Sequence, residues 1–129
     1  MHPNRDGRER ALELLYEAEA RGVGAVELLG EQLVSSEFTR TAVAGTTEQI
    51  EKIDQLISDR SKDWAVSRLA AVDRALLRLA VWELLEHKEV SAAVVISEAV
   101  ELAGIFSTEK SKKFVNGVLA AVATDLGRS

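Results

Sequence analysis

The chain has 129 residues, 47% hydrophobic and 29% charged, which suits one domain spanning residues 1–129 and is too short for two ordinary ones. Its formal net charge of −5 argues against a protein that coats nucleic acid non-specifically, although a local basic patch can still bind RNA. The absence of cysteine excludes disulfides and thiolate chemistry, and no apolar run reaches the roughly 18 residues of a membrane span, so we expect a cytoplasmic protein without membrane contact.

Apolar periodicity predicts helices and no strand in the first half of the chain. A first helix is expected at residues 8–21 and a short second helix at residues 26–33. Ser35 and Ser36 can cap a third, longer helix that continues to about residue 61. The first helix would place four side chains on its inner face: Leu12, Leu15, Tyr16 and Glu19.

The second half of the chain predicts a central, strongly buried helix. After a short turn at residues 64–70, apolar side chains cover a broad face of residues 72–85. A polar connection then leads to Ser91, a candidate cap for a helix that ends near Gly104. We therefore expect this central helix to be packed on several sides.

The last helix begins at Ser107 or Thr108 and carries an apolar stripe of Phe114, Val118, Val122 and Leu126. Because this periodicity continues through Gly117, we expect that glycine to be packed closely inside the helix, at a propensity cost of about 1 kcal/mol. All of these patterns together predict an all-α fold.

Residues typical of catalysis are sparse. His2 and His87 have no partners at metal-ligand spacing, so we expect both to be solvated. Glu98 and Glu101 lie three residues apart without an accompanying Glu-x-x-His motif, which favours a solvated or capping role. No phosphate loop, nucleophile elbow or dinucleotide fingerprint is present. We expect no enzyme activity, no catalytic residue, no metal and no cofactor.

Two segments are locally basic. Residues 60–78 contain five basic and two acidic side chains, and residues 107–116 contain three basic and one acidic side chain. In the second segment Lys113 precedes Phe114, a pair that can hold a phosphate and stack on an unpaired base. Phe114 can equally be a core residue with solvated lysines around it. Tyr16 is open to the same two interpretations, core or rim.

Four stretches together resemble the NusB family of transcription antitermination factors: residues 8–16, 38–45, 71–84 and, most specifically, 96–119. The resemblance covers nearly the whole chain, and its strength lies in the order and spacing of these stretches. It implies a compact bundle of about seven helices in two helical subdomains.

The resemblance also implies a function and candidate residues. NusB proteins bind single-stranded boxA RNA together with ribosomal protein NusE, and the complex helps RNA polymerase resist termination, chiefly on ribosomal RNA operons. The residues matching the family's RNA surface, with the neighbouring lysines, are Arg5, Arg8, Arg10, Tyr16, Lys110, Lys112, Lys113 and Phe114. The residues matching its NusE contact are Asp73 and Arg74.

Departures from the family pattern leave alternatives open. The arginine-rich arm is diluted, with four basic and five acidic side chains in residues 1–21, whereas Lys110 stands where relatives are often acidic. One alternative is a structural or homodimeric paralogue that has lost RNA binding. Another is an RNA-recognition domain for an rRNA methyltransferase, which requires a catalytic domain after Ser129.

Overall fold

The structure, a computed structural model, describes residues 4–34, 36–62 and 65–128. Within these ranges it consists of seven α-helices and one short 3-10 helix, without a strand, so the predicted all-α fold is confirmed. None of the described helices is both long and apolar enough to cross a bilayer. In chain order the elements are α1 (Arg5–Arg21), α2 (Ala25–Glu31), α3 (Glu37–Glu48), α4 (Ile50–Arg60), η1 (Val66–Arg68), α5 (Ala71–Glu86), α6 (Ala92–Phe106) and α7 (Glu109–Asp125).

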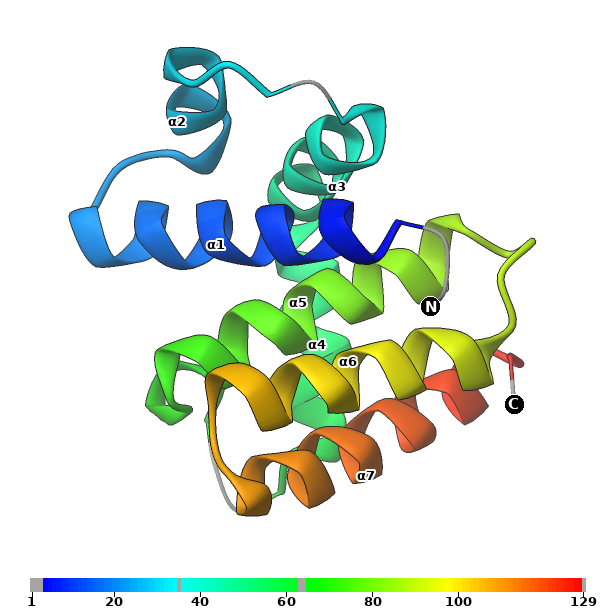
Figure 1. Cartoon of the computed structure of the whole chain (residues 1–129). Coiled ribbons are helices and arrows are strands. Elements are labelled where there is room, and N and C mark those ends of the chain that lie inside the picture. The colour runs from blue at the N-terminus through cyan, green and yellow to red at the C-terminus, as the bar shows by residue number, and fades with distance from the viewer. Residues whose placement is uncertain (1–3, 35, 63–64, 129) are drawn as a thin grey trace.

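The helices form two groups that meet at α5 (Figure 1). Helices α1, α2 and α3 pack against one another in the upper part of the view, whereas α6 and α7 lie together below α5. Helix α5 contacts α1, α3, α4, α6 and α7, and most of its side chains are buried. The predicted central helix and the two groups of helices are therefore both present.

Local sequence signals account for several helix ends. The side chains of Ser36, Ser91 and Thr108 accept hydrogen bonds from backbone N–H groups three residues on, at 3.1, 3.2 and 3.1 Å. Gly22 ends α1 in the left-handed conformation, with φ of 70°. Ser35, the other predicted cap, lies outside the described residues, as do His2 and Trp64.

The prediction of one long third helix was wrong. The chain bends at Gln49, whose φ and ψ of −104° and 20° end α3 and begin α4. Its side chain donates a hydrogen bond to Glu86 at 2.7 Å, which ties the bend to the end of α5. Because α3 packs on α1 and α4 on α7, the bend lets each helix bury its apolar face against a different neighbour.

Helices α3 and α5 approach each other closely at Gly45 on α3. A Cβ atom on this glycine would lie 2.0 Å from Nε1 of Trp82, so only glycine lets the indole pack there. Trp82 also makes edge-on contacts with the rings of Phe38 and His87, at centroid distances of 5.8 and 5.0 Å. His87 therefore belongs to an aromatic cluster, and since its side chain is 31% exposed, the prediction that it is solvated holds only in part.

Two further expectations about helix faces were also wrong. Gly117 is exposed, and a Cβ atom there would meet open space, so it is not a packing glycine. Helix α1 buries Ala11, Leu12, Leu14 and Ala18, whereas Tyr16 and Glu19 are exposed. Leu12 and Leu15 do face the core, so the inner face of α1 is rotated from the predicted one toward Leu14 and Ala18 and away from Tyr16 and Glu19.

Candidate nucleic-acid interface

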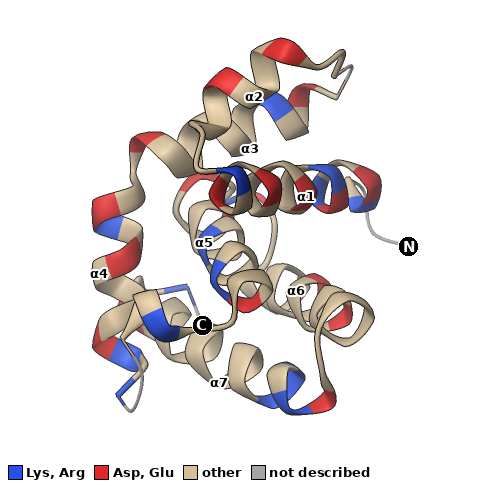
Figure 2. Cartoon of the chain, turned by 90° about the vertical axis from the view of Figure 1, so that its left-hand side faces the viewer, with Lys and Arg blue, Asp and Glu red and all other residues tan. Residues whose placement is uncertain are grey.

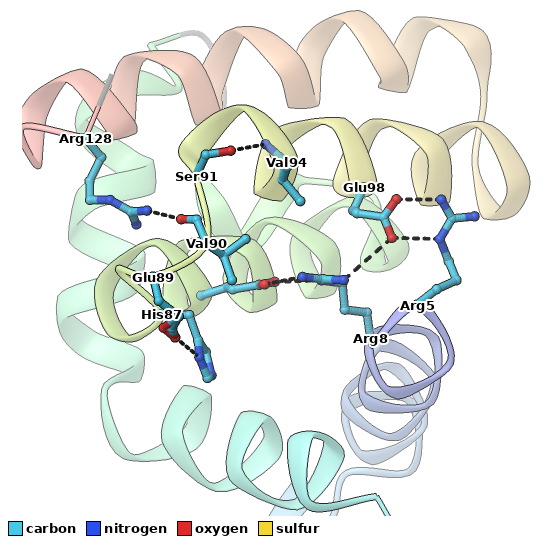
Figure 3. A network of polar contacts seen from close by, with 10 residues as sticks. Arg5, Arg8, His87, Glu89, Val90, Ser91, Val94, Glu98 and Arg128 are labelled. Atoms are coloured by element: carbon cyan, nitrogen blue, oxygen red, sulfur yellow. Dashed lines mark hydrogen bonds and ion pairs between the residues drawn. The ribbon is translucent and has the colours of Figure 1, made fainter. Parts of the chain in front are cut away.

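A buried ion-pair network joins α1 to α5 and α6 (Figure 3). Arg8 on α1 donates to Glu83 on α5, with 2.9 Å between Nε and Oε1, and its guanidinium lies 3.6 Å from Glu98 on α6. Arg5, one turn earlier, donates to both oxygens of Glu98, with 2.7 and 2.5 Å between the atoms, and to Glu101. Two arginines of the first turns of α1 are therefore anchored by carboxylates.

The network places Arg8 in the protein interior. Its side chain is 4% exposed and that of Glu83 is 2% exposed, so a phosphate cannot reach this guanidinium in the observed arrangement. Glu98 is 1% exposed, which corrects the expectation that it is solvated or caps a helix. Arg5 is 20% exposed, and its hydrogen bonds to Glu98 raise the pKa of its guanidinium. Arg5 thus remains at the surface but is held by acidic groups.

The two other candidates on α1 have different surroundings. Arg10 is half-buried, and its guanidinium donates to the side-chain oxygen of Gln32 beyond α2. Tyr16 is 42% exposed, which decides between its two interpretations in favour of the surface. Its ring is therefore accessible for stacking.

The first turns of α7 carry the most accessible cations among the predicted site residues. Lys110 and Lys113 are exposed and form no ion pair with any described carboxylate. Lys112 is half-buried, and its ammonium lies 3.6 Å from a carboxylate oxygen of Glu109. Phe114 is half-buried: one part of the ring packs on the core and another part lines a pocket. The structure thus combines both interpretations of Phe114.

That pocket, hereafter the α5–α7 pocket, has a volume of about 300 Å³. Asp73 lies in it with 8% of its surface exposed, and its Oδ2 accepts a hydrogen bond from the Ser111 hydroxyl at 2.9 Å. Its Oδ1 has no hydrogen-bond partner among the described residues. The lining residues are Arg68, Leu69, Ala70, Asp73, Lys110, Ser111 and Phe114. Sequence reasoning did not identify Ser111, since no motif marks it.

The basic segment at residues 60–78 is largely neutralised. Arg60 pairs with Asp125, which lowers the pKa of that carboxyl, and Arg78 donates to Asp54 at 2.8 Å through both Nε and Nη2. Figure 2 shows Lys and Arg positions alternating with Asp and Glu positions along α4. In contrast, Arg68 is exposed and has no ion-pair partner in the described part of the chain.

Arg74, which is predicted to contact a partner protein, organises the turn before α5. Its guanidinium donates to the backbone carbonyls of Val66 and Leu69, at 3.2 and 2.7 Å, and pairs with Glu19 on α1. Burial lowers the pKa of this guanidinium. Arg74 therefore fixes η1 and the start of α5, and so positions Arg68 beside the α5–α7 pocket.

The described residues contain no group of three or more His, Asp or Glu side chains placed to hold a metal ion. The carboxylates of Glu98 and Glu101 both pair with Arg5. The groups described above are suited to binding. They are the exposed ammonium and guanidinium groups of Lys110, Lys113 and Arg68, the accessible rings of Tyr16 and Phe114, and the buried carboxylate of Asp73.

Comparison with known proteins gives a consistent result. A model of the NusB family matches residues 5–124. The chain is 42% identical over 128 residues to the transcription antitermination protein NusB of Kineococcus radiotolerans, and the match covers 95% of this chain and 94% of that protein.

Two solved structures extend the likeness to the fold. One is NusB of T. maritima, with a TM-score of 0.88 and 36% identity over 96% of this chain and 92% of that one. The other contains antitermination factors NusB and NusE with double-stranded RNA, where the TM-score is 0.82 at 32% identity over 95% of this chain and 96% of that one. The resemblance seen in the sequence is confirmed, and the chain belongs to the NusB family.

Proposed function

We propose that this protein is a transcription antitermination factor that binds boxA-like RNA together with NusE and helps RNA polymerase transcribe ribosomal RNA operons. Its relatives bear the antitermination name, and a related chain has been solved with NusE and RNA. The observation that carries the proposal is the surface at the start of α7, where the exposed Lys110 and Lys113 flank the partly exposed ring of Phe114.

This surface suits single-stranded RNA. Ammonium groups neutralise phosphates and release counterions, while a partly exposed ring stacks on unpaired bases. Lys110, Lys112, Lys113 and Phe114 form the main contact in this proposal, and Arg10 and Tyr16 add to it from α1. Arg5 and Arg8 can bind RNA only if their ion pairs with Glu98 and Glu83 break. For the buried Arg8, breaking the pair is costly because it leaves a buried carboxylate unpaired.

NusE is proposed to dock near the start of α5, where the resemblance places Asp73 and Arg74. Asp73 is buried, and Arg74, 12% exposed, is held by Glu19 and by backbone carbonyls, so the accessible features there are the exposed Arg68 and Ala70. The proposed role is that of an adaptor in the cytoplasmic antitermination complex, acting by binding and without catalysis of its own.

Light scattering after size-exclusion chromatography tests the proposal against the homodimeric alternative. The protein, NusE and a boxA-like RNA are run singly and mixed. A complex containing one copy of each component is expected. A homodimer that persists in the presence of both NusE and RNA would contradict the proposal and favour a paralogue whose RNA surface is covered by a second copy.

A further inference from the structure

One carboxylate oxygen of Asp73, a residue that lines the α5–α7 pocket, is left without a hydrogen bond among the described residues. Asp73 sits in the first turn of α5, where its negative charge suits the helix dipole, but its Oδ1 has no partner in the described part of the chain. A buried acceptor without a partner loses the hydrogen bond that it would make with water, which is unfavourable. A hydrogen-bond donor entering the pocket would recover that loss.

Asp73 is held rigidly for such a task. The Ser111 hydroxyl donates to Oδ2 at 2.9 Å and lies 2.8 and 3.1 Å from the hydroxyls of Ser107 and Thr108. Because the single Ser111 proton is directed at the carboxylate, the two neighbouring hydroxyls can donate to Ser111 in turn. This chain of hydroxyls fixes one oxygen of Asp73 and leaves the other oxygen as the free acceptor.

The pocket has the walls and size for a flat aromatic group. Phe114 supplies a ring, Leu69 and Ala70 supply apolar surface, and the volume of about 300 Å³ is at the lower end of the range for small-molecule sites. Oδ1 itself is shielded from solvent, so a ligand reaches it by displacing side chains at the rim. Lys110, which lines the pocket, is exposed and has a flexible side chain, so it can move to admit a ligand.

Charge decides between a nucleobase and a basic side chain of a partner protein. The lining combines the carboxylate of Asp73 with two cations, Arg68 and Lys110. A lysine or arginine side chain would be attracted by the first and repelled by the other two. A neutral nucleobase can donate an N–H hydrogen bond to the Asp73 carboxylate, while the phosphate of the same nucleotide can pair with Arg68 and Lys110.

From these observations we infer that the α5–α7 pocket binds one unpaired nucleobase of the RNA and selects bases that carry an exocyclic amino group. Cytosine and adenine present such a donor on their pairing edges, as guanine does, whereas uracil presents carbonyl acceptors there and its only donor is the ring imide. The inference rests on the proposed RNA-binding function and deepens it, because it assigns base selectivity to a residue, Asp73, expected to contact NusE.

The test measures binding of a boxA-like RNA and of single-base variants, each with one base replaced by uracil. For the unaltered protein, one position should show a loss of about tenfold on replacement. In Asp73→Asn an amide N–H₂ group replaces the carboxylate acceptor. The loss of affinity caused by uracil at the sensitive RNA position should therefore vanish or reverse. Asp59→Asn, an exposed α4 residue with the same change of charge, should keep this loss of affinity.

A second measurement uses the unaltered protein and does not depend on the folding of a variant. The base at the selected position is replaced by an analogue that lacks only the amino group, such as 2-pyrimidinone for cytosine. Affinity should again fall about tenfold. Equal affinity for the two RNAs would overturn the inference.

The outcomes separate this inference from the proposed function. If the unaltered protein prefers boxA-like RNA over a scrambled one but Asp73→Asn keeps every base preference, the inference fails and the function stands. If Asp73→Asn weakens NusE binding and leaves base preference intact, the pocket holds a protein side chain and the inference also fails. If the unaltered protein does not discriminate between RNAs at all, both fail.

Discussion

Arg8 on α1 and Glu83 on α5 form an ion pair in the protein core, 75 positions apart in the chain, with 2.9 Å between Nε and Oε1. Both side chains are at least 96% buried. Through this contact Arg8, for which the resemblance predicts RNA binding, connects α1 to α5.

Glu83→Gln should therefore lower the free energy of unfolding by about 3 kcal/mol, because it removes the negative charge that pairs with a buried guanidinium. Denaturation in urea followed by circular dichroism measures this. Glu17→Gln removes the carboxylate of the exposed pair with Arg21 and should change stability by less than about 1 kcal/mol. Equal stability of the two variants would show that the buried pair contributes nothing specific.

Gly45→Ala should destabilise the protein, although alanine normally favours a helix over glycine. The added methyl group would lie 2.0 Å from Nε1 of Trp82 and force the indole out of its place, at a cost of about 1–3 kcal/mol. Gly117→Ala is the matched control, since its methyl group meets open space and should stabilise α7 by about 0.5–1 kcal/mol. Thermal unfolding of both variants measures these effects. A higher melting temperature for Gly45→Ala would contradict the close contact between Gly45 and Trp82.

Glu101→Gln should strengthen RNA binding. Glu101 is 54% exposed and shares Arg5 with Glu98, so its removal leaves this guanidinium freer to meet a phosphate. Since surface pairs contribute up to about 1 kcal/mol, a rise in affinity of roughly three- to fivefold is expected. Glu27→Gln makes the same change of charge at an exposed position of α2. The prediction fails if both variants bind RNA equally well, because net charge alone would then account for the gain.

Lys113→Ala combined with Phe114→Ala should weaken RNA binding while the fold is retained. Loss of base stacking costs about 1–3 kcal/mol, and loss of the ammonium group should reduce the salt dependence by about 0.7 in the log–log slope. Lys88→Ala, at an exposed position after α5, is the control. If circular dichroism shows unfolding and binding falls only in proportion, Phe114 acts as a core residue.

The helices were predictable because their signals are local. The caps Ser91 and Thr108 and the apolar stripe of α7 depend on residues within a few positions of one another. The bend at Gln49 was not predictable, since no proline or glycine marks it and its cause is packing against different partners.

The candidate site was predictable only in part. The exposure of Lys110 and Lys113 follows from the charged composition of the first turns of α7. The burial of Arg8 and the hydrogen bond between Ser111 and Asp73 join residues 75 and 38 positions apart, and no periodicity reports such contacts. A charged residue in an amphipathic pattern is expected at the surface, and only the fold shows which charges are paired inside.

The most direct test of the central claim is fluorescence anisotropy of a labelled boxA-like RNA and a scrambled RNA, titrated with this protein alone and with NusE. The account predicts preferential binding to the boxA-like RNA, strengthened by NusE, with log affinity falling by roughly 0.7 per phosphate contact for each log unit of salt. Equal and weak binding to both RNAs, unchanged by NusE, would contradict it.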